Sequence, residues 1–153
     1  MAEETLAAAV NNQQMADELN ALIRLDYDAI AAYELAIEQL ESAEFKQKLG
    51  EFRDDHVRHT QNLADLIRWM GAAPVKAGDA MQMMTKAKVH LGNLRGDKGI
   101  LQAMKSNEDN TNAGYEKAIR NLRASQDMAD VLRENLEDER RHRAWLEETL
   151  AGL

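Results

Sequence analysis

Hydrophobic residues recur along most of the chain at the three- and four-residue spacing of an amphipathic helix. The clearest stripe runs from Phe45 to Met70 in unbroken alternating steps of four and three residues. Gly71 and Pro74 follow this stripe as residues that commonly end a helix. The whole pattern predicts four long helices, at residues 15–42, 44–70, 98–123 and 126–150.

The segment between the second and third helices, residues 72–97, is too long for a tight turn and long enough to run the length of a bundle. Met81, Met84, Ala87 and Leu91 predict a short amphipathic helix within it. We therefore expect an all-α protein, a four-helix bundle made of two helical hairpins that are joined by a long crossover containing a short helix.

The composition agrees with one helical domain. The 153 residues suit a single hydrophobic core, aromatic residues make up only 5% of the chain and there is one proline. The net charge of -8 argues against nucleic acid bound through a basic face, and it favours the attraction of cations.

The chain has no cysteine, which excludes disulfides, iron–sulfur clusters and thiolate zinc sites within it. Glu3 and Glu4 stand where a secretory signal would need positive charge. No apolar stretch approaches the roughly 20 residues that span a bilayer. We expect a cytoplasmic protein with neither a membrane nor nucleic acid as partner.

Six carboxylate and imidazole side chains interrupt the hydrophobic stripes of the four helices. Residues three apart on a helix share a face, so a pair on the second helix and a pair on the fourth can each aim two donors at one point. A single core histidine is more often structural, but burying six such groups without compensation would be costly. The joint pattern predicts a site for iron, manganese or zinc, in which carboxylates can bridge two ions. The candidate ligands are Asp26, His56, His59, Glu108, Glu139 and His142.

The two predicted hairpins look like copies of one another. The run DYDAIAAYELAIEQL from Asp26 aligns with EDNTNAGYEKAIRNL from Glu108 at an offset of 82 residues. With one residue added, DDHVRH in the second helix aligns with DERRH in the fourth. The paired positions include Tyr33 with Tyr115, His56 with Glu139, and His59 with His142.

These residues give nearly the whole chain a resemblance to the ferritin-like group of di-metal carboxylate proteins, near the bacterioferritin and rubrerythrin branch. The likeness is carried by the run LNALIRLDYDAIAAY, by Glu108 seven residues before Tyr115, and by DERRHRAWLEETL with its Glu-x-x-His pair. The resemblance implies the following roles: chelating carboxylates at Asp26 and Glu108, a bridging carboxylate at Glu139, imidazole ligands at His59 and His142, and hydrogen-bond donors to the ligands at Tyr33 and Tyr115.

The chain departs from the family pattern at His56, where the family places its second bridging glutamate. The three remaining carboxylates carry one negative charge fewer than two divalent ions need, which should weaken the second ion unless another anion helps. Asp55, four residues before His59, could turn inward and is a further candidate ligand. Asp138 is expected to orient His142 by accepting a hydrogen bond. Whether one or two ions bind is left open.

The resemblance implies a reduced iron site, with manganese or zinc as alternatives, that reacts with oxygen or peroxide as an iron oxidase or peroxidase-type oxidoreductase. Haem is not expected, because Val57 stands where bacterioferritin offers its axial methionine. Without cysteine the chain lacks the iron centre that supplies electrons in rubrerythrins, so turnover would need an external electron donor. The 11 residues after His142 leave no room for the extra helix of cage ferritins, and we expect a monomer or homodimer.

Two other hypotheses follow from the same residues. The replacement at His56 favours a non-catalytic bundle that acts in stress or binds a partner, with a vestigial site. A single zinc or manganese ion with a structural role is the third hypothesis. Binding of one ion without any reaction with peroxide would support it.

Overall fold

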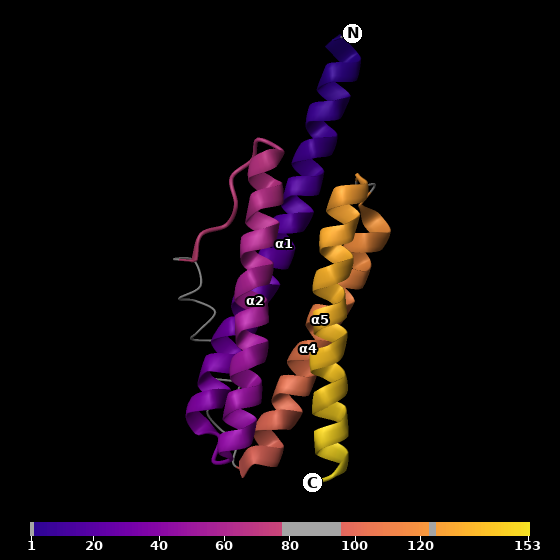
Figure 1. Cartoon of the computed structure of the whole chain (residues 1–153). Helices are drawn as coiled ribbons and strands as arrows, with labels where there is room; N and C mark the ends of the chain where they lie inside the picture. Colours follow the sequence, from indigo (N-terminus) through magenta and orange to yellow (C-terminus); the bar gives the residue numbers. More distant parts are fainter. Residues whose placement is uncertain (1, 78–95, 123–124) are drawn as a thin grey trace.

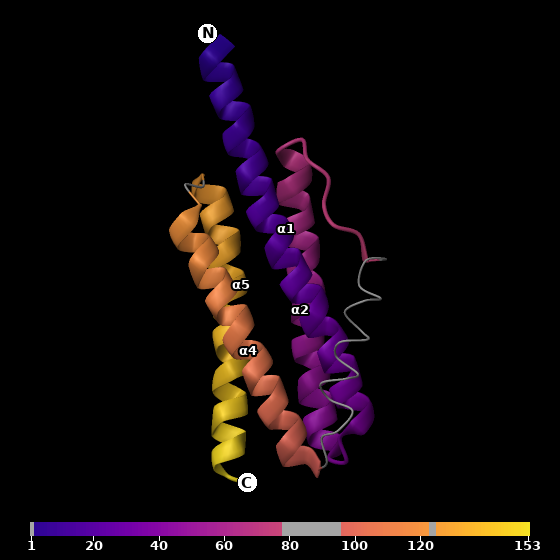
Figure 2. The same ribbon diagram turned by 180° about the vertical axis from the view of Figure 1, so that it is seen from behind.

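The computed structural model describes residues 2–77, 96–122 and 125–153, without the side chains of residues 4–10. The described residues form four long α-helices: α1 (Ala2–Gln39), α2 (Ala43–Trp69), α4 (Gly96–Asn121) and α5 (Gln126–Ala151). The hairpin of α1 and α2 lies alongside the hairpin of α4 and α5, with α1 against α4 and α2 against α5 (Figures 1 and 2). The expected all-α four-helix bundle is confirmed. The short helix predicted around residues 81–91 lies outside the described residues.

Helix α1 differs most from its predicted bounds. The sequence pattern places its start at residue 15, but the helix begins at Ala2, and its first turns extend past the ends of the other helices (Figure 1). A hydrophobic stripe reports only the part of a helix that other elements cover, whereas alanine, leucine and glutamate favour helix without any partner. The early segment AEETLAAAV is rich in these residues.

Short capping interactions fix where α1, α2 and α4 begin and end. Ser42 is the extended N-cap of α2 and accepts a hydrogen bond from the amide of Phe45 at 3.3 Å, so α1 stops at Gln39 rather than at 42. The carboxylate of Asp97, in the first turn of α4, accepts hydrogen bonds from the amides of Glu41 and Ser42 at 2.8 and 3.0 Å. The loop between α1 and α2 is thereby attached to the start of α4.

The other end of α2 closes as the sequence predicts. Gly71 has a φ of 79°, a left-handed conformation that glycine adopts without strain. The amide of Gly71 donates to the carbonyl of Arg68 and the amide of Ala72 donates to the carbonyl of Ile67, which is the hydrogen-bond pattern of a Schellman motif. The helix therefore ends within a residue of its predicted boundary.

The bundle interior consists of two apolar clusters with a polar layer between them. On every helix the buried ionisable residues stand between positions of one apolar cluster and positions of the other. In α2, for example, Phe52 belongs to the first cluster and Leu63 to the second, and His56 and His59 lie between them. The four helices thus bring their polar residues to a common level. None of the described helices is long and apolar enough to cross a membrane.

We predict that Phe52→Ala lowers the free energy of unfolding by about 3–5 kcal/mol, because it leaves a cavity beside the polar layer. The Phe52 ring is fully buried, stacks on His142 with 4.2 Å between ring centroids, and meets the edge of Trp145. Val57→Ala on the same helix is the control and should change stability by less than about 0.5 kcal/mol, since Val57 is 36% exposed. Urea unfolding measures both, and equal losses would contradict the cluster assignment.

Candidate metal centre

All six predicted ligand residues meet in the polar layer, and each has no exposed surface. Their ligand atoms form two sets, and within each set the atoms lie within 4.8 Å of one another. The first ligand set is Asp26, His56, His59 and Glu139. The second ligand set is His56, Glu108, Glu139 and His142. The sets share one residue of α2 and one residue of α5, so they are two halves of one centre.

The donor atoms of the first ligand set lie close to one another. Nδ1 of His56 lies 2.8 Å from Oδ1 of Asp26 and 3.3 Å from Oε1 of Glu139. Nδ1 of His59 lies 3.3 Å and 3.1 Å from the same two oxygens. Ligands that sit about 2.0–2.2 Å from a transition-metal ion are about 3–3.5 Å from one another. The three longer spacings fall in this range, and the 2.8 Å contact between His56 and Asp26 is a hydrogen-bond distance.

In the second ligand set, the distances from the α5 histidine to the carboxylates are longer than those in the first set. Nε2 of His56 lies 3.1 Å from Oε1 of Glu108. Nδ1 of His142 lies 3.4 Å from that oxygen and 3.9 Å from Oε2 of Glu139. This Nδ1 atom is fully buried, and none of the described residues is its hydrogen-bond partner. A buried ring nitrogen without a partner is costly in a hydrogen-bonded core, and here it faces two carboxylates.

Two aspartates at the edge of the centre hold the outer nitrogens of the histidines. Oδ2 of Asp55 lies 2.8 Å from Nε2 of His142, and Oδ2 of Asp138 lies 3.0 Å from Nε2 of His59. Each aspartate thus binds the histidine of the opposite helix. We expected Asp138 to orient His142, and the structure corrects this pairing: an aspartate on one helix points across to its neighbour.

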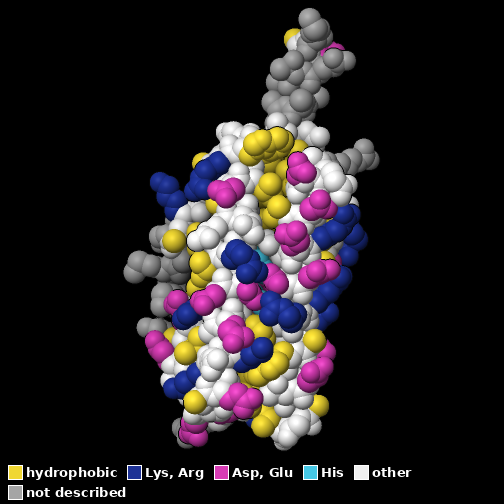
Figure 3. All heavy atoms as spheres, viewed as in Figure 1, with side chains coloured by type: hydrophobic (Ala, Val, Ile, Leu, Met, Phe, Trp, Pro, Cys, Tyr) yellow, Lys and Arg dark blue, Asp and Glu magenta, His cyan; other side chains and the backbone are white. Residues whose placement is uncertain are grey.

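Asp55 does not turn inward and belongs to neither ligand set. Its carboxylate is held at the edge by Nε2 of His142 and by Arg141 at 2.8 Å. Arg141 also donates to Asp138 at 2.9 Å, and Arg58 donates to both aspartates. The space-filling view shows acidic and basic side chains mixed over this face of α2 and α5 (Figure 3). The network fixes both histidine rings with their Nδ1 atoms toward the interior.

Both predicted tyrosines donate hydrogen bonds to ligand carboxylates, and they do so across the bundle. The hydroxyl of Tyr115 on α4 donates to Oδ2 of Asp26 on α1 at 2.6 Å. The hydroxyl of Tyr33 on α1 donates to Oε1 of Glu108 on α4. Each tyrosine therefore restrains the carboxylate of the facing helix.

Burial and neighbouring charges shift the pKa values of several groups in the centre. Burial disfavours a charged imidazole, but the nearby carboxylates outweigh it and hold the pKa of His56 well above its ordinary value. In the same way, hydrogen bonds to Asp138 and Asp26 overcome burial and raise the pKa of His59 to about 10. Burial raises the pKa of Glu139 to about 7. The carboxylates thus favour positive charge on these two rings, which a bound cation could supply instead.

Three further polar residues of the centre were not among the predicted site residues. The hydroxyl of Thr111 lies 2.9 Å from Oε2 of Glu139 and 3.2 Å from Oε2 of Glu108. The amide of Asn112 donates to the backbone carbonyls of these two residues, and the amide of Asn135 donates to the Tyr115 hydroxyl. The position of Thr111 on the inner stripe, three residues after Glu108, was the available sequence signal.

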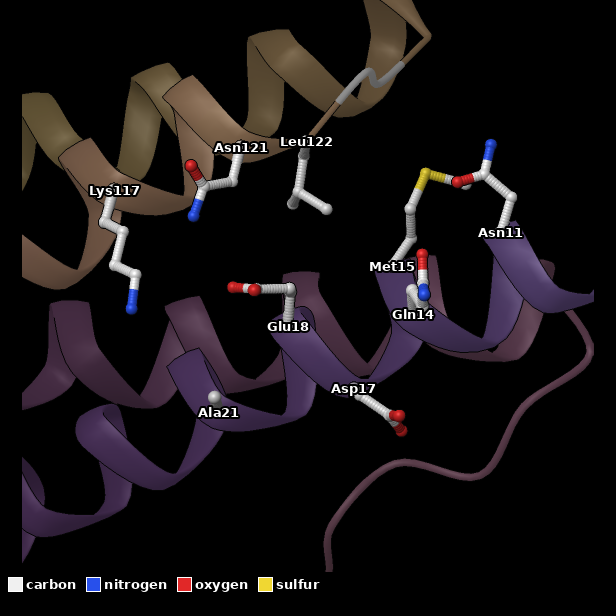
Figure 4. Close-up of a pocket in the computed structure, with 9 residues that line it drawn as sticks. All are labelled: Asn11, Gln14, Met15, Asp17, Glu18, Ala21, Lys117, Asn121 and Leu122. Carbon is white, nitrogen blue, oxygen red and sulfur yellow. The ribbon is translucent and has the colours of Figure 1, made fainter.

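A separate pocket lies between α1 and the end of α4 (Figure 4). In the close-up, the side chains of Glu18 and Lys117 point into the space between the two helices. None of the residues that line this pocket belongs to either ligand set. The pocket and the buried centre are therefore distinct features of the bundle.

We predict that Tyr115→Phe lowers the free energy of unfolding by about 1–3 kcal/mol, because it removes a donor from a buried carboxylate. Tyr27→Phe on α1 makes the same chemical change at a half-buried position outside the centre and should have a smaller effect. Thermal and urea unfolding of the metal-free proteins measure the difference. Equal stability of the two variants would show that the Tyr115–Asp26 hydrogen bond contributes nothing.

Comparison with known proteins gives a family and a fold. A family model described as "Domain of unknown function (DUF2383)" matches residues 14–121, more than half of the chain. No curated protein matches the chain. Among solved structures, the chain is similar to one described as a dodecameric thioferritin, the bacterioferritin-related protein from Bacteroides fragilis. The TM-score is 0.76 and the identity 17%, over 92% of this chain and 86% of that chain. This likeness shows that the fold is ferritin-like.

Proposed function

The chain belongs to the DUF2383 family, and we propose that it is a metalloprotein that binds two divalent transition-metal ions in the buried centre of its ferritin-like bundle. The observation that carries the proposal is the buried Nδ1 atom of His142, which has no hydrogen-bond partner among the described residues and faces two carboxylates. The adjacent first ligand set offers a second group of donors at coordination spacing. One ion in each ligand set would give the Nδ1 atom of His142 a partner and would bind the donors of the first ligand set.

The donor atoms favour iron, manganese or zinc. Both sets consist of imidazole nitrogens and carboxylate oxygens, a mixture that suits these ions better than calcium or magnesium. The chain has no thiolate that would select copper(I) or an iron–sulfur cluster. We propose iron as the physiological metal, with manganese and zinc as alternatives.

We propose that the loaded centre reacts with oxygen or peroxide. Two ferrous ions can supply the two electrons that reduce one hydrogen peroxide to two waters, with uptake of two protons. The chain's own residues exclude bulk water from the centre, since all six ligands are buried. Asp55 and Asp138 hold the imidazole rings in place, and the tyrosines restrain the carboxylates. With no cysteine in the chain, return of the electrons requires an external donor.

A second candidate is a centre that holds one ion, or none, without redox chemistry. It is favoured by the hydrogen bonds of His56, which meets carboxylates on both sides of its ring and so leaves those groups paired without metal. In this case the second ligand set would serve stability alone. The number of ions bound separates the two candidates.

We predict that the wild-type protein binds two ferrous ions per chain under anaerobic conditions and that Glu139→Gln weakens binding by about 100-fold or more. Glu139 faces both ligand sets, and even indirect supports of a metal ligand contribute 10–100-fold in affinity. Glu137→Gln is the matched control, on the same helix and exposed, and should bind like wild type. Equilibrium dialysis with iron analysis measures the stoichiometry, and one ion or none in the wild type would contradict the proposal.

We predict that iron bound in the wild-type centre is oxidised by hydrogen peroxide faster than iron bound by Glu139→Gln, because the variant lacks the shared carboxylate. Stopped-flow absorbance in the near ultraviolet follows the ferric product. Addition of a small reductant should then restore the ferrous form and permit a second turnover. Oxidation at the rate of free ferrous ion in the same buffer would instead support the non-catalytic candidate.

A further inference from the structure

The ring of His56 lies between the two ligand sets and faces a different set with each nitrogen. Nδ1 is 2.8 Å from Asp26 and 3.3 Å from Glu139, which belong to the first ligand set. Nε2 is 3.1 Å from Glu108, which belongs to the second. The ring therefore spans the boundary between the two halves of the centre.

The contacts of His56 differ from those of the other two histidines. His59 and His142 each turn one nitrogen toward the interior and give the other to an aspartate at the edge. Among the contacts of the described residues, His56 has no such outer aspartate, and both of its nitrogens meet only groups of the ligand sets. Within the part of the chain that the structure describes, no group at the edge of the bundle binds either of its nitrogens.

The ring is also held in this orientation by its neighbours. His56 is fully buried, and its ring lies 5.3 Å from that of Tyr33, 5.5 Å from that of His59 and 5.2 Å from that of His142. Aromatic rings on three sides leave it little room to swing out of the centre. Its two nitrogens are therefore available to the two sets at the same time.

We propose that His56 is a bridging ligand, which binds one ion of the first ligand set through Nδ1 and one ion of the second through Nε2. This inference rests on the proposed function and extends it to how the two ions are connected. An imidazole bound through both nitrogens has no ring proton and carries one negative charge. Together with the three ligand carboxylates it supplies four negative charges, which match two divalent ions. The apparent deficit of one carboxylate at this position is thereby removed.

The bridge has a geometric consequence. Two ions bound to opposite nitrogens of one ring lie farther apart than the about 3.5–4 Å of ions in most two-metal sites. A glutamate at position 56 would remove the ring and allow the closer spacing. As a bridge, His56 therefore sets the distance between the ions and also supplies the fourth negative charge that balances them.

Cobalt(II) is a suitable probe, because X-ray absorption reports both the imidazole rings around each ion and the distance between ions. We expect two cobalt ions per wild-type chain, with two imidazole nitrogens on each and no cobalt–cobalt distance below about 4 Å. In His56→Glu we expect two ions with one imidazole nitrogen on each and a cobalt–cobalt distance of about 3.5–4 Å. His56→Gln, which cannot bridge through two ring nitrogens, should bind the second ion at least about tenfold more weakly.

Other results would overturn the inference and leave metal binding intact. These are two ions in the wild type with one imidazole nitrogen each, or two ions in the wild type with a short cobalt–cobalt distance. A wild-type protein that binds one cobalt ion or none would contradict the proposed function itself. Circular dichroism checks that each variant is folded, and the imidazole count of the wild type decides the question if a variant does not fold.

Discussion

The structure depends on the burial of six ionisable side chains in the middle of a four-helix core. An isolated charge in such an interior is very unfavourable, and even a paired charge recovers its lost hydration only with good geometry. Every carboxylate of the centre accordingly meets imidazole nitrogens, and Asp26 and Glu108 each also accept a hydrogen bond from a tyrosine. Apolar clusters above and below keep water out of this layer. The packing of the helices and the arrangement of the charges therefore support one another.

The same arrangement makes a metal ion a natural occupant. In the metal-free chain, the nearby carboxylates raise the pKa values of His56 and His59 and so favour a proton on each ring. A divalent cation can replace these protons at the same positions, because the inward nitrogens already stand at coordination spacing. The aspartates at the edge then keep the outer nitrogens occupied, so the rings need not turn when an ion enters.

The helical spacing of apolar residues predicts most of the fold. It also identifies all six buried residues that meet in the centre. A residue such as Glu108 is recognisable as a candidate ligand because it occupies a position of the inward-facing stripe where apolar side chains are expected. The period cannot show which residues on facing helices meet, since that depends on the rotation and register of each helix. For this reason the pairing of Asp138 with His59 was missed, and so was the contact of Thr111 with Glu139. The early start of α1 was missed because uncovered turns carry no stripe.

His56 stands where the sequence resemblance to ferritin-like proteins leads to the expectation of a carboxylate. A glutamate at this position would complete four carboxylates, whereas the imidazole places two nitrogens between the ligand sets. Whether this bundle is a dinuclear metalloprotein is tested most directly by anomalous diffraction from crystals loaded anaerobically with iron. We expect two iron peaks, one within each ligand set. Peaks confined to exposed carboxylates, or no peak near His142, would contradict this expectation.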